Sequence, residues 1–157
     1  MITYRKATAS DLDTLIQLRL DYLAEDRGFR SETEKSAVAA QLKEYIPKHI
    51  GDDFVAWFAE TEGSVVAVAF LVIDERPANL SFITGRIGTV LNVLTYAQYR
   101  GQGIATQLLK RLVEEAKSRR LSYIKLSATE AGRPLYEKLG FVETQSHYTE
   151  MKYQLQY

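Results

Sequence analysis

Hydrophobic and polar positions follow two different periods along the chain, which predicts a mixture of helices and strands. Capping-box signals at Thr8 and Ser31 precede apolar residues with helical spacing, so we expect a helix after each, with Pro47 kinking or ending the second. Alternating or continuous apolar runs predict strands, and a further extended tail begins at Phe141. The expected strands span residues 2–6, 54–59, 65–73, 87–95, 123–127 and 148–155.

The clearest helical signal follows the strand over 87–95. Apolar residues at 104, 105, 108, 109, 112, 113 and 116 form one stripe and predict a helix from about Gly103 to Ser118. A short helix over 134–139 ends at Gly140, and Gly63 provides the turn of a hairpin. Residues 74–86 lack periodicity, as is typical of functional or mobile loops. The element order predicts an α/β fold, one mixed domain over residues 1–157.

Composition narrows the classes of protein. Among the 157 residues, Lys plus Arg and Asp plus Glu number 20 each, so no nucleic acid or anionic membrane is expected as the main partner. No cysteine is present, which excludes disulfides and cysteine chemistry and agrees with a cytoplasmic location. Early charges such as Arg5 and Asp11 argue against a signal peptide, and the apolar run over 65–73 is too short to span a membrane.

Gly101 and Gly103 lie where the strand over 87–95 turns into the long helix. Glycines permit a positive φ there, and free N–H groups at the helix start favour a phosphate, with Arg100 adding charge. The alternative is a turn that only starts the helix. Ile104 follows Gly103 where a P-loop needs Lys-Ser, and Thr106 occupies a position where a dinucleotide motif needs a small residue.

Two motifs together carry a family resemblance. The stretch from Asn92 to Ala105 resembles the acetyl-CoA motif of the GCN5-related N-acetyltransferase (GNAT) family, and Leu135-Tyr136-Glu-Lys-Leu-Gly140-Phe141 resembles its second signature. The resemblance implies a mostly antiparallel central sheet with helices on both faces. It also implies that the strand end splays from its neighbour, so that its freed backbone groups bind acetyl-CoA. The implied cofactor-binding residues are Val93, Leu94, Thr95, Arg100, Gly101, Gly103, Ile104, Ala105, Thr129 and Tyr136.

Tyr136 is the expected general acid, because a phenol stays protonated at neutral pH and can donate to a departing thiolate. Gly132, four residues earlier, is expected to open space for the cofactor. The alternative is a core aromatic that merely touches the cofactor. Thr129 replaces a common Asn and Ala97 a common Pro, and the strand over 87–95 lacks a carboxylate. The general base stays open among Glu60, Asp74, Glu75, Glu130 and a solvent relay.

The implied reaction is direct transfer of the acetyl group of acetyl-CoA to a primary amine of a small molecule or protein, without an acyl-enzyme. A catalytically weak CoA-binding sensor is the alternative.

Five acids between Asp21 and Glu34 suit a cationic amine, although such a run is usually a solvated face. His49 and His147 lack metal-ligand spacing, so no metal is expected, and a homodimer is a family-level expectation. Five aromatic residues either line a wall of the acceptor pocket or pack in the core: Tyr22, Tyr45, Trp57, Phe82 and Tyr148.

Overall fold

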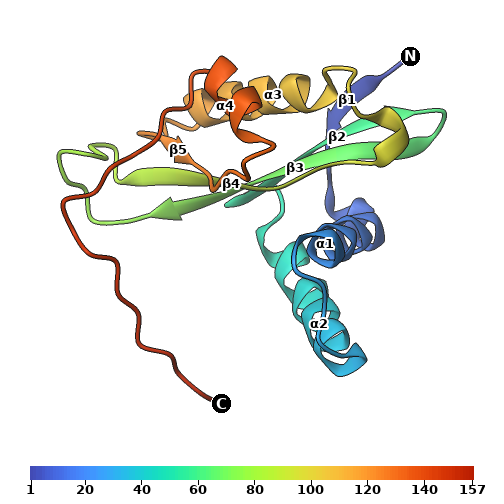
Figure 1. The fold of residues 1–157 in the computed structure, drawn as a ribbon, viewed down its shortest axis with the longest axis horizontal. Helices are drawn as coiled ribbons and strands as arrows, with labels where there is room; N and C mark the ends of the chain where they lie inside the picture. Colours follow the sequence, from blue (N-terminus) through green and yellow to red (C-terminus); the bar gives the residue numbers. More distant parts are fainter. The chain divides into compact units, whose positions relative to one another are not determined.

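The computed structural model describes residues 1–157, which form two compact units, Met1–Ser127 and Ala128–Tyr157. The first unit contains a five-stranded sheet in the order β1-β2-β3-β4-β5 (Figure 1). All neighbouring strands are antiparallel except β4 and β5, which run parallel. The strands are β1 (Thr3–Lys6), β2 (Phe54–Thr61), β3 (Ser64–Glu75), β4 (Arg86–Thr95) and β5 (Ile124–Lys125).

Helices cover both faces of this sheet. Figure 1 shows α1 (Leu12–Asp26) and α2 (Glu32–His49) on one face and α3 (Ile104–Ser118) on the other. Alternation along the strands explains the two layers, because successive side chains point to opposite faces. Phe54, Ala56, Phe58, Val68 and Phe70 join the core cluster of α1 and α2, which includes the buried residues Leu15, Leu18, Leu42 and Ile46. The mostly antiparallel sheet with helices on both faces is therefore confirmed.

The apolar stripe of α3 faces inward as its spacing predicts. Leu108, Leu109 and Leu112 are fully buried, and Ile104 and Ala116 are nearly so. At about 25 cal/mol per Å² of apolar surface, burying each leucine contributes roughly 1.5–3 kcal/mol. This packing fixes the start of α3, at Ile104, directly after the glycine turn.

Both predicted helix starts are confirmed. The Thr8 N–H donates to the Asp11 carboxylate at 2.8 Å, in a capping box that opens a short 3₁₀ turn, η1 (Ala9–Asp11), before α1. The Ser31 hydroxyl accepts from the Glu34 N–H at 3.1 Å and caps α2. Pro47 does not end α2 two residues early, because the Ile50 N–H still donates to the Ile46 carbonyl at 2.9 Å.

The hairpin between β2 and β3 turns on two residues with positive φ, Glu62 at 51° and Gly63 at 78°. Such a turn matches the right-handed twist of the two strands. The next loop, residues 76–85, is closed by the Arg76 N–H, which donates to the Gly85 carbonyl at 2.7 Å. The long loop predicted over 74–86 is therefore two residues shorter at its start, where β3 continues.

The second unit contains α4 (Arg133–Lys138), and residues 141–157 form no helix or strand. The strand expected over 148–155 is wrong for this structure, although polar and apolar residues alternate there. Strand propensity depends on packing and on a partner ladder, and these residues belong to no β-ladder. No helix of the protein combines the length and the apolar character that crossing a membrane requires.

Candidate functional site

The pairing of β4 with β3 is interrupted near its end. Phe70 faces Leu91 and Val68 faces Leu94, so Asn92 and Val93 together oppose one residue of β3. This is a β-bulge, and Asn92 adopts the left-handed φ of 54° within it. The bulge lies at the start of the stretch from Asn92 to Ala105 that resembles the acetyl-CoA motif.

The other edge of β4 is paired only at its beginning. β5 contacts β4 at two register positions, Gly88 with Ile124 and Thr89 with Lys125. From Val90 onward no strand follows the outer edge of β4. Backbone polar groups along such an edge need water or a ligand, and an extended chain of amides can bond there. The separation of the two strands is the geometry that the resemblance implied for Val93, Leu94 and Thr95.

The glycine turn continues this edge into α3. Gly101 and Gly103 both have φ of 77°, and a Cβ added to either would meet no atom within 4 Å. The first N–H groups of α3, at Ile104 and Ala105, have no acceptor inside the helix. Open space beside free N–H groups and the positive helix end fits a phosphate or pyrophosphate.

Arg100 does not extend freely toward this space. Its Nε donates to the Thr95 carbonyl at 2.8 Å, and one terminal nitrogen lies 3.4 Å from the Glu25 carboxylate. The side chain thus ties the glycine turn back to the end of β4 and to α1. Its side chain is about half exposed, so the charge still adds to the positive potential at the start of α3.

Helix α1 supplies a polar wall beside the end of β4. The Tyr96 hydroxyl donates to the Asp21 carboxylate at 2.5 Å, and burial, followed by this hydrogen bond, raises the pKa of the Tyr96 phenol above its usual value. Deeper in the wall, one terminal nitrogen of Arg19 donates to Oδ1 of Asn92 at 3.2 Å. Asn92 is fully buried and also donates to the Leu18 carbonyl at 3.5 Å.

The second unit holds the remaining predicted residues. The Thr129 hydroxyl accepts from the Gly132 N–H at 3.1 Å, at the start of α4. A Cβ on Gly132 would lie 3.2 Å from the ring of Tyr136 and from the Thr129 hydroxyl. Gly132 therefore makes room for the Tyr136 ring, and the expectation that it also opens space for a cofactor stays a prediction. Phe141 packs edge-on against the same ring, with centroids 5.9 Å apart.

None of the candidate general bases is marked out by its own surroundings. Glu60 accepts from Arg5 at 2.7 Å, Asp74 lies 3.5 Å from Arg76, and Glu75 and Glu130 are exposed. His49 bonds Asp53 at 2.7 Å and stacks on Tyr45. No three His, Cys, Asp or Glu side chains gather in a group that could hold a metal ion.

The aromatic residues considered as a wall lie in different places. Tyr22 and Tyr45 pack against the core cluster beside α1 and α2, and Phe82 contacts Tyr123. Trp57 faces the opposite side of the sheet, and Tyr148 belongs to the second unit. Tyr22 and Tyr45 therefore pack in the core, and they share no wall with Trp57.

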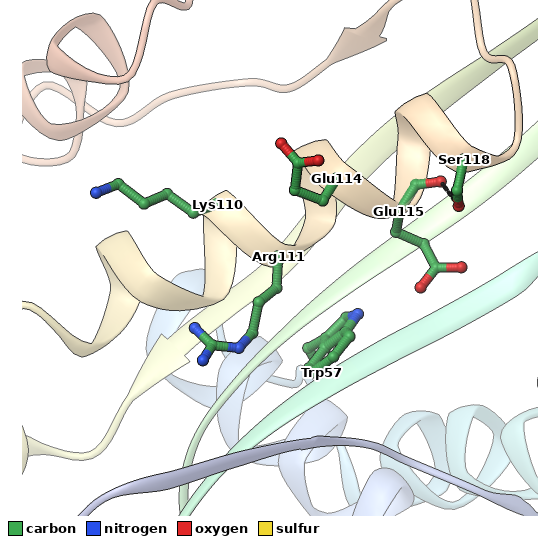
Figure 2. Close-up of a pocket in the computed structure, with 6 residues that line it drawn as sticks. All are labelled: Trp57, Lys110, Arg111, Glu114, Glu115 and Ser118. Carbon is green, nitrogen blue, oxygen red and sulfur yellow. Dashed lines mark hydrogen bonds between the residues drawn. The ribbon is translucent and has the colours of Figure 1, made fainter.

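Trp57 instead lines a pocket of about 370 Å³ along α3, which contains none of the predicted site residues. Figure 2 shows its indole beneath the α3 side chains of Arg111 and Glu115. The Arg111 guanidinium lies 4.1 Å from the ring centroid of Tyr4, and Glu115 pairs with Lys6 and Arg119. Arg111 and Glu115 are thus engaged by residues just outside the pocket.

Three residues of the site were not predicted: Arg19, Asn92 and Tyr96. Each carried a weak signal in the sequence. Asn92 is a lone amide within an apolar strand, and Arg19 occupies a position with the helical spacing of the buried face of its helix. A polar group at a core position indicates a specific partner, but the partner is visible only in the fold.

Comparison with known proteins identifies this arrangement. The profile of the acetyltransferase (GNAT) family matches residues 15–141. A probable glucosamine 6-phosphate N-acetyltransferase 2 of rice (Oryza sativa subsp. japonica) is 33% identical over 100 residues, covering 60% of this chain and 57% of that protein. A second rice protein, glucosamine 6-phosphate N-acetyltransferase 1, is 31% identical over 98 residues, covering 60% and 56%. The chain thus spans somewhat more than half the length of these relatives.

A solved structure is similar over nearly its whole length. It is a predicted acetyltransferase with acetyl-CoA from Clostridium acetobutylicum, 32% identical, with a TM-score of 0.79 over 97% of this chain and 96% of that one. A GCN5-related N-acetyltransferase from Ralstonia eutropha, 24% identical, shares the fold with a TM-score of 0.80 over 96% and 99%.

Proposed function

The chain belongs to the acetyltransferase (GNAT) family, and from that membership we propose that it is an acetyl-CoA-dependent N-acetyltransferase spanning residues 1–157. It transfers the acetyl group directly to a primary amine of a small molecule or protein. One observation carries the proposal. The end of β4 is bulged, open along one edge and continuous with a glycine turn and the start of α3.

The donor side of the reaction uses this edge. Backbone groups of Val93, Leu94 and Thr95 bond the amides of the pantetheine arm, because no strand pairs with them on that side and only the Thr95 carbonyl already accepts a bond, from Arg100. The pyrophosphate occupies the open space at Gly101 and Gly103, against the N–H groups of Ile104 and Ala105. Thr129 is a further residue that the resemblance assigns to the cofactor, and its hydroxyl already accepts from the Gly132 N–H.

The chemistry needs no covalent enzyme intermediate. Bound acetyl-CoA supplies an activated thioester carbon, to which the neutral amine nitrogen bonds while the carbon–sulfur bond breaks. Tyr136 donates its phenolic proton to the departing sulfur and regains one from solvent. The proton that the amine loses passes to water or to a carboxylate, since no carboxylate lies on β4 itself. Preorganised backbone N–H groups at the bulge stabilise the oxyanion.

A ligand-binding experiment tests whether the protein binds acetyl-CoA, the acetyl donor. Acetyl-CoA or CoA at 100 times its dissociation constant should raise the free energy of unfolding by about 2.7 kcal/mol, measured as a thermal shift. NAD and ATP at equal concentration should leave the midpoint unchanged. A shift with NAD or ATP and none with acetyl-CoA would contradict the proposal.

Release of free thiol in the presence of a panel of amines tests whether the acetyl group is transferred to an amine acceptor. Glucosamine 6-phosphate belongs in that panel because two relatives are named for it. Binding of acetyl-CoA without thiol release for any amine would favour a CoA-binding sensor instead.

Substitution Tyr136→Phe tests the general acid. We expect kcat to fall about a hundredfold with unchanged acetyl-CoA affinity, because one acid–base group typically contributes that much. Tyr153→Phe, in the same unit and 89% exposed, is the matched control and should keep full activity. If Tyr136→Phe turns over normally, Tyr136 only packs against its neighbours.

A further inference from the structure

Arg19 is the side chain of α1 that contacts the β4 bulge. One of its terminal nitrogens donates to Oδ1 of Asn92 at 3.2 Å, and Nδ2 of Asn92 donates to the Leu18 carbonyl. Asn92 is fully buried and held in the left-handed conformation, so its amide has a fixed direction. The guanidinium is therefore positioned beside the bulge by a rigid neighbour rather than left to sample many rotamers.

Arg19 carries its charge without a carboxylate partner. It is half-buried, and burial lowers the pKa of its guanidinium, while Tyr22 and Asp26 act on it only at longer range. None of the ion pairs formed in the structure includes Arg19. The arginines that do form them are Arg5, Arg30, Arg76, Arg100, Arg119 and Arg133. Partly removing a cation from water without a counter-ion is unfavourable, which points to an anion supplied from outside the chain.

Two acids of α1 close to the end of β4 are already engaged. The Asp21 carboxylate accepts the Tyr96 hydroxyl at 2.5 Å, and Glu25 pairs with Arg100. Asp26, in the same acidic run, acts on Arg19 through its charge but forms no ion pair with it. At the bulge itself, the wall of α1 presents a guanidinium with four N–H groups that have no partner, since only one is used by Asn92.

We propose that Arg19 binds an anionic group, a carboxylate or a phosphate, of the acceptor amine. The proposal rests on the proposed function, which places the reacting thioester along the end of β4. An acceptor that enters from the α1 side then meets Arg19 before its nitrogen reaches that strand. A guanidinium suits this task because its planar fork bonds two oxygens of one oxyanion. The enzyme accordingly selects amines that carry a negative charge near the nitrogen.

Matched acceptors distinguish an anion anchor from other roles. Glucosamine 6-phosphate is compared with glucosamine, and alanine with alaninamide, so that each pair differs in one anionic group. We expect the wild-type protein to favour the anionic member of one pair, which also tells phosphate from carboxylate. Arg19→Gln should raise KM for that acceptor tenfold to a hundredfold, leave kcat for the neutral member unchanged, and leave acetyl-CoA affinity unchanged. Arg19→Lys should restore part of the loss.

Arg27→Gln is the control, since Arg27 is an exposed arginine that directly follows the same helix. It should behave as the wild type with every acceptor. If Arg19→Gln instead lowers kcat equally for charged and neutral acceptors, the guanidinium acts on the reacting carbonyl or on the fold, and the anchor is refuted. A wild-type preference for the neutral member of both pairs refutes it as well.

A binding measurement covers the case in which no acceptor turns over. Inorganic phosphate and acetate are titrated into the CoA-saturated protein by calorimetry, for wild type, Arg19→Gln and Arg27→Gln. Binding that disappears only in Arg19→Gln supports the anchor, and the absence of binding to the wild type overturns it. Failure of the proposed function has a separate signature, because acetyl-CoA itself would then produce no thermal shift.

Discussion

The two halves of β4 belong to one uninterrupted strand but have different surroundings. Arg86–Thr89 pairs with β3 on one edge and with β5 on the other, and Gly88 also donates to the Tyr123 carbonyl at 3.0 Å. From Val90 to Thr95 the strand keeps β3 but loses β5, and it is bulged at Asn92 and Val93. The first half is a structural strand, whereas the second exposes backbone groups that a ligand can bond.

The difference arises from the short partner rather than from β4 itself. Apolar residues run through both halves, and both are largely buried. Because β5 is only Ile124–Lys125, pairing stops where the binding edge begins. A binding site can thus be made by ending a neighbouring strand early, without any polar residue to mark it in the sequence.

Gly88→Val should have the largest effect on stability, because it disrupts the packing of the half of β4 that is paired on both edges. A Cβ there would lie 2.7 Å from Leu71 and 2.9 Å from Leu121, so we expect a loss of about 3 kcal/mol in the free energy of unfolding. Urea denaturation measures it. Thr89→Val, at the next residue and half-buried, is the control and should change stability by less than about 1 kcal/mol. Equal stability of the two variants would show that Leu71 and Leu121 do not pack tightly over Gly88.

The bulge is tested by comparing Asn92→Ala with Asn92→Gly. Both variants lose the hydrogen bonds to Arg19 and Leu18, which should lower the free energy of unfolding by about 1–2 kcal/mol. Alanine is also strained by the φ of 54°, which glycine adopts freely, so it should be about 1 kcal/mol less stable than the glycine variant. The two free energies of unfolding are compared directly. If glycine is no better than alanine, the strand straightens on substitution and the bulge depends on Asn92.

Gly103→Ala tests the glycine turn that follows the open half of β4. Gly63→Ala, in the hairpin between β2 and β3, is the matched control. The two glycines have φ of 77° and 78°, and an added Cβ meets nothing at either site. Each variant should lose about 1 kcal/mol of stability from backbone strain. Only Gly103→Ala should also weaken acetyl-CoA binding, by about tenfold, as measured by calorimetry. Unchanged affinity would mean that the phosphate does not approach this turn closely.

Tyr96→Phe should have the smallest effect. At pH values under 9 it should lower the free energy of unfolding by about 0.5–1 kcal/mol, because the hydrogen bond to Asp21 is lost. The pKa of the Tyr96 phenol is raised in the folded state, so its stabilisation is present below its ordinary pKa near 10 and is lost as pH rises further. Wild type should therefore lose more stability than Tyr96→Phe between pH 9 and pH 11. The control Tyr148→Phe, at an 83% exposed residue, should follow the wild-type curve. Parallel curves for all three proteins would contradict a raised pKa at Tyr96.

Local signals in the sequence were sufficient to predict much of the fold. Thr8 and Ser31 began helices where their caps predicted, and the stripe from Ile104 to Ala116 was buried as its period required. The glycine turn was recognised because φ > 0 and a helix start are local properties. The strand over 148–155 failed for the opposite reason, since alternation specifies a strand only when a partner is present.

The sequence by itself determined most of the elements, the two motifs and the family, because capping, periodicity and turn chemistry act over a few neighbouring residues. Only the tertiary structure decided where β5 leaves β4, how the bulge turns Asn92 toward α1, and that Arg19 meets it from 73 positions earlier in the chain. Those features depend on contacts between distant segments. A lone amide in a strand and a lone arginine on a helix acquire a common role only when packing brings them together.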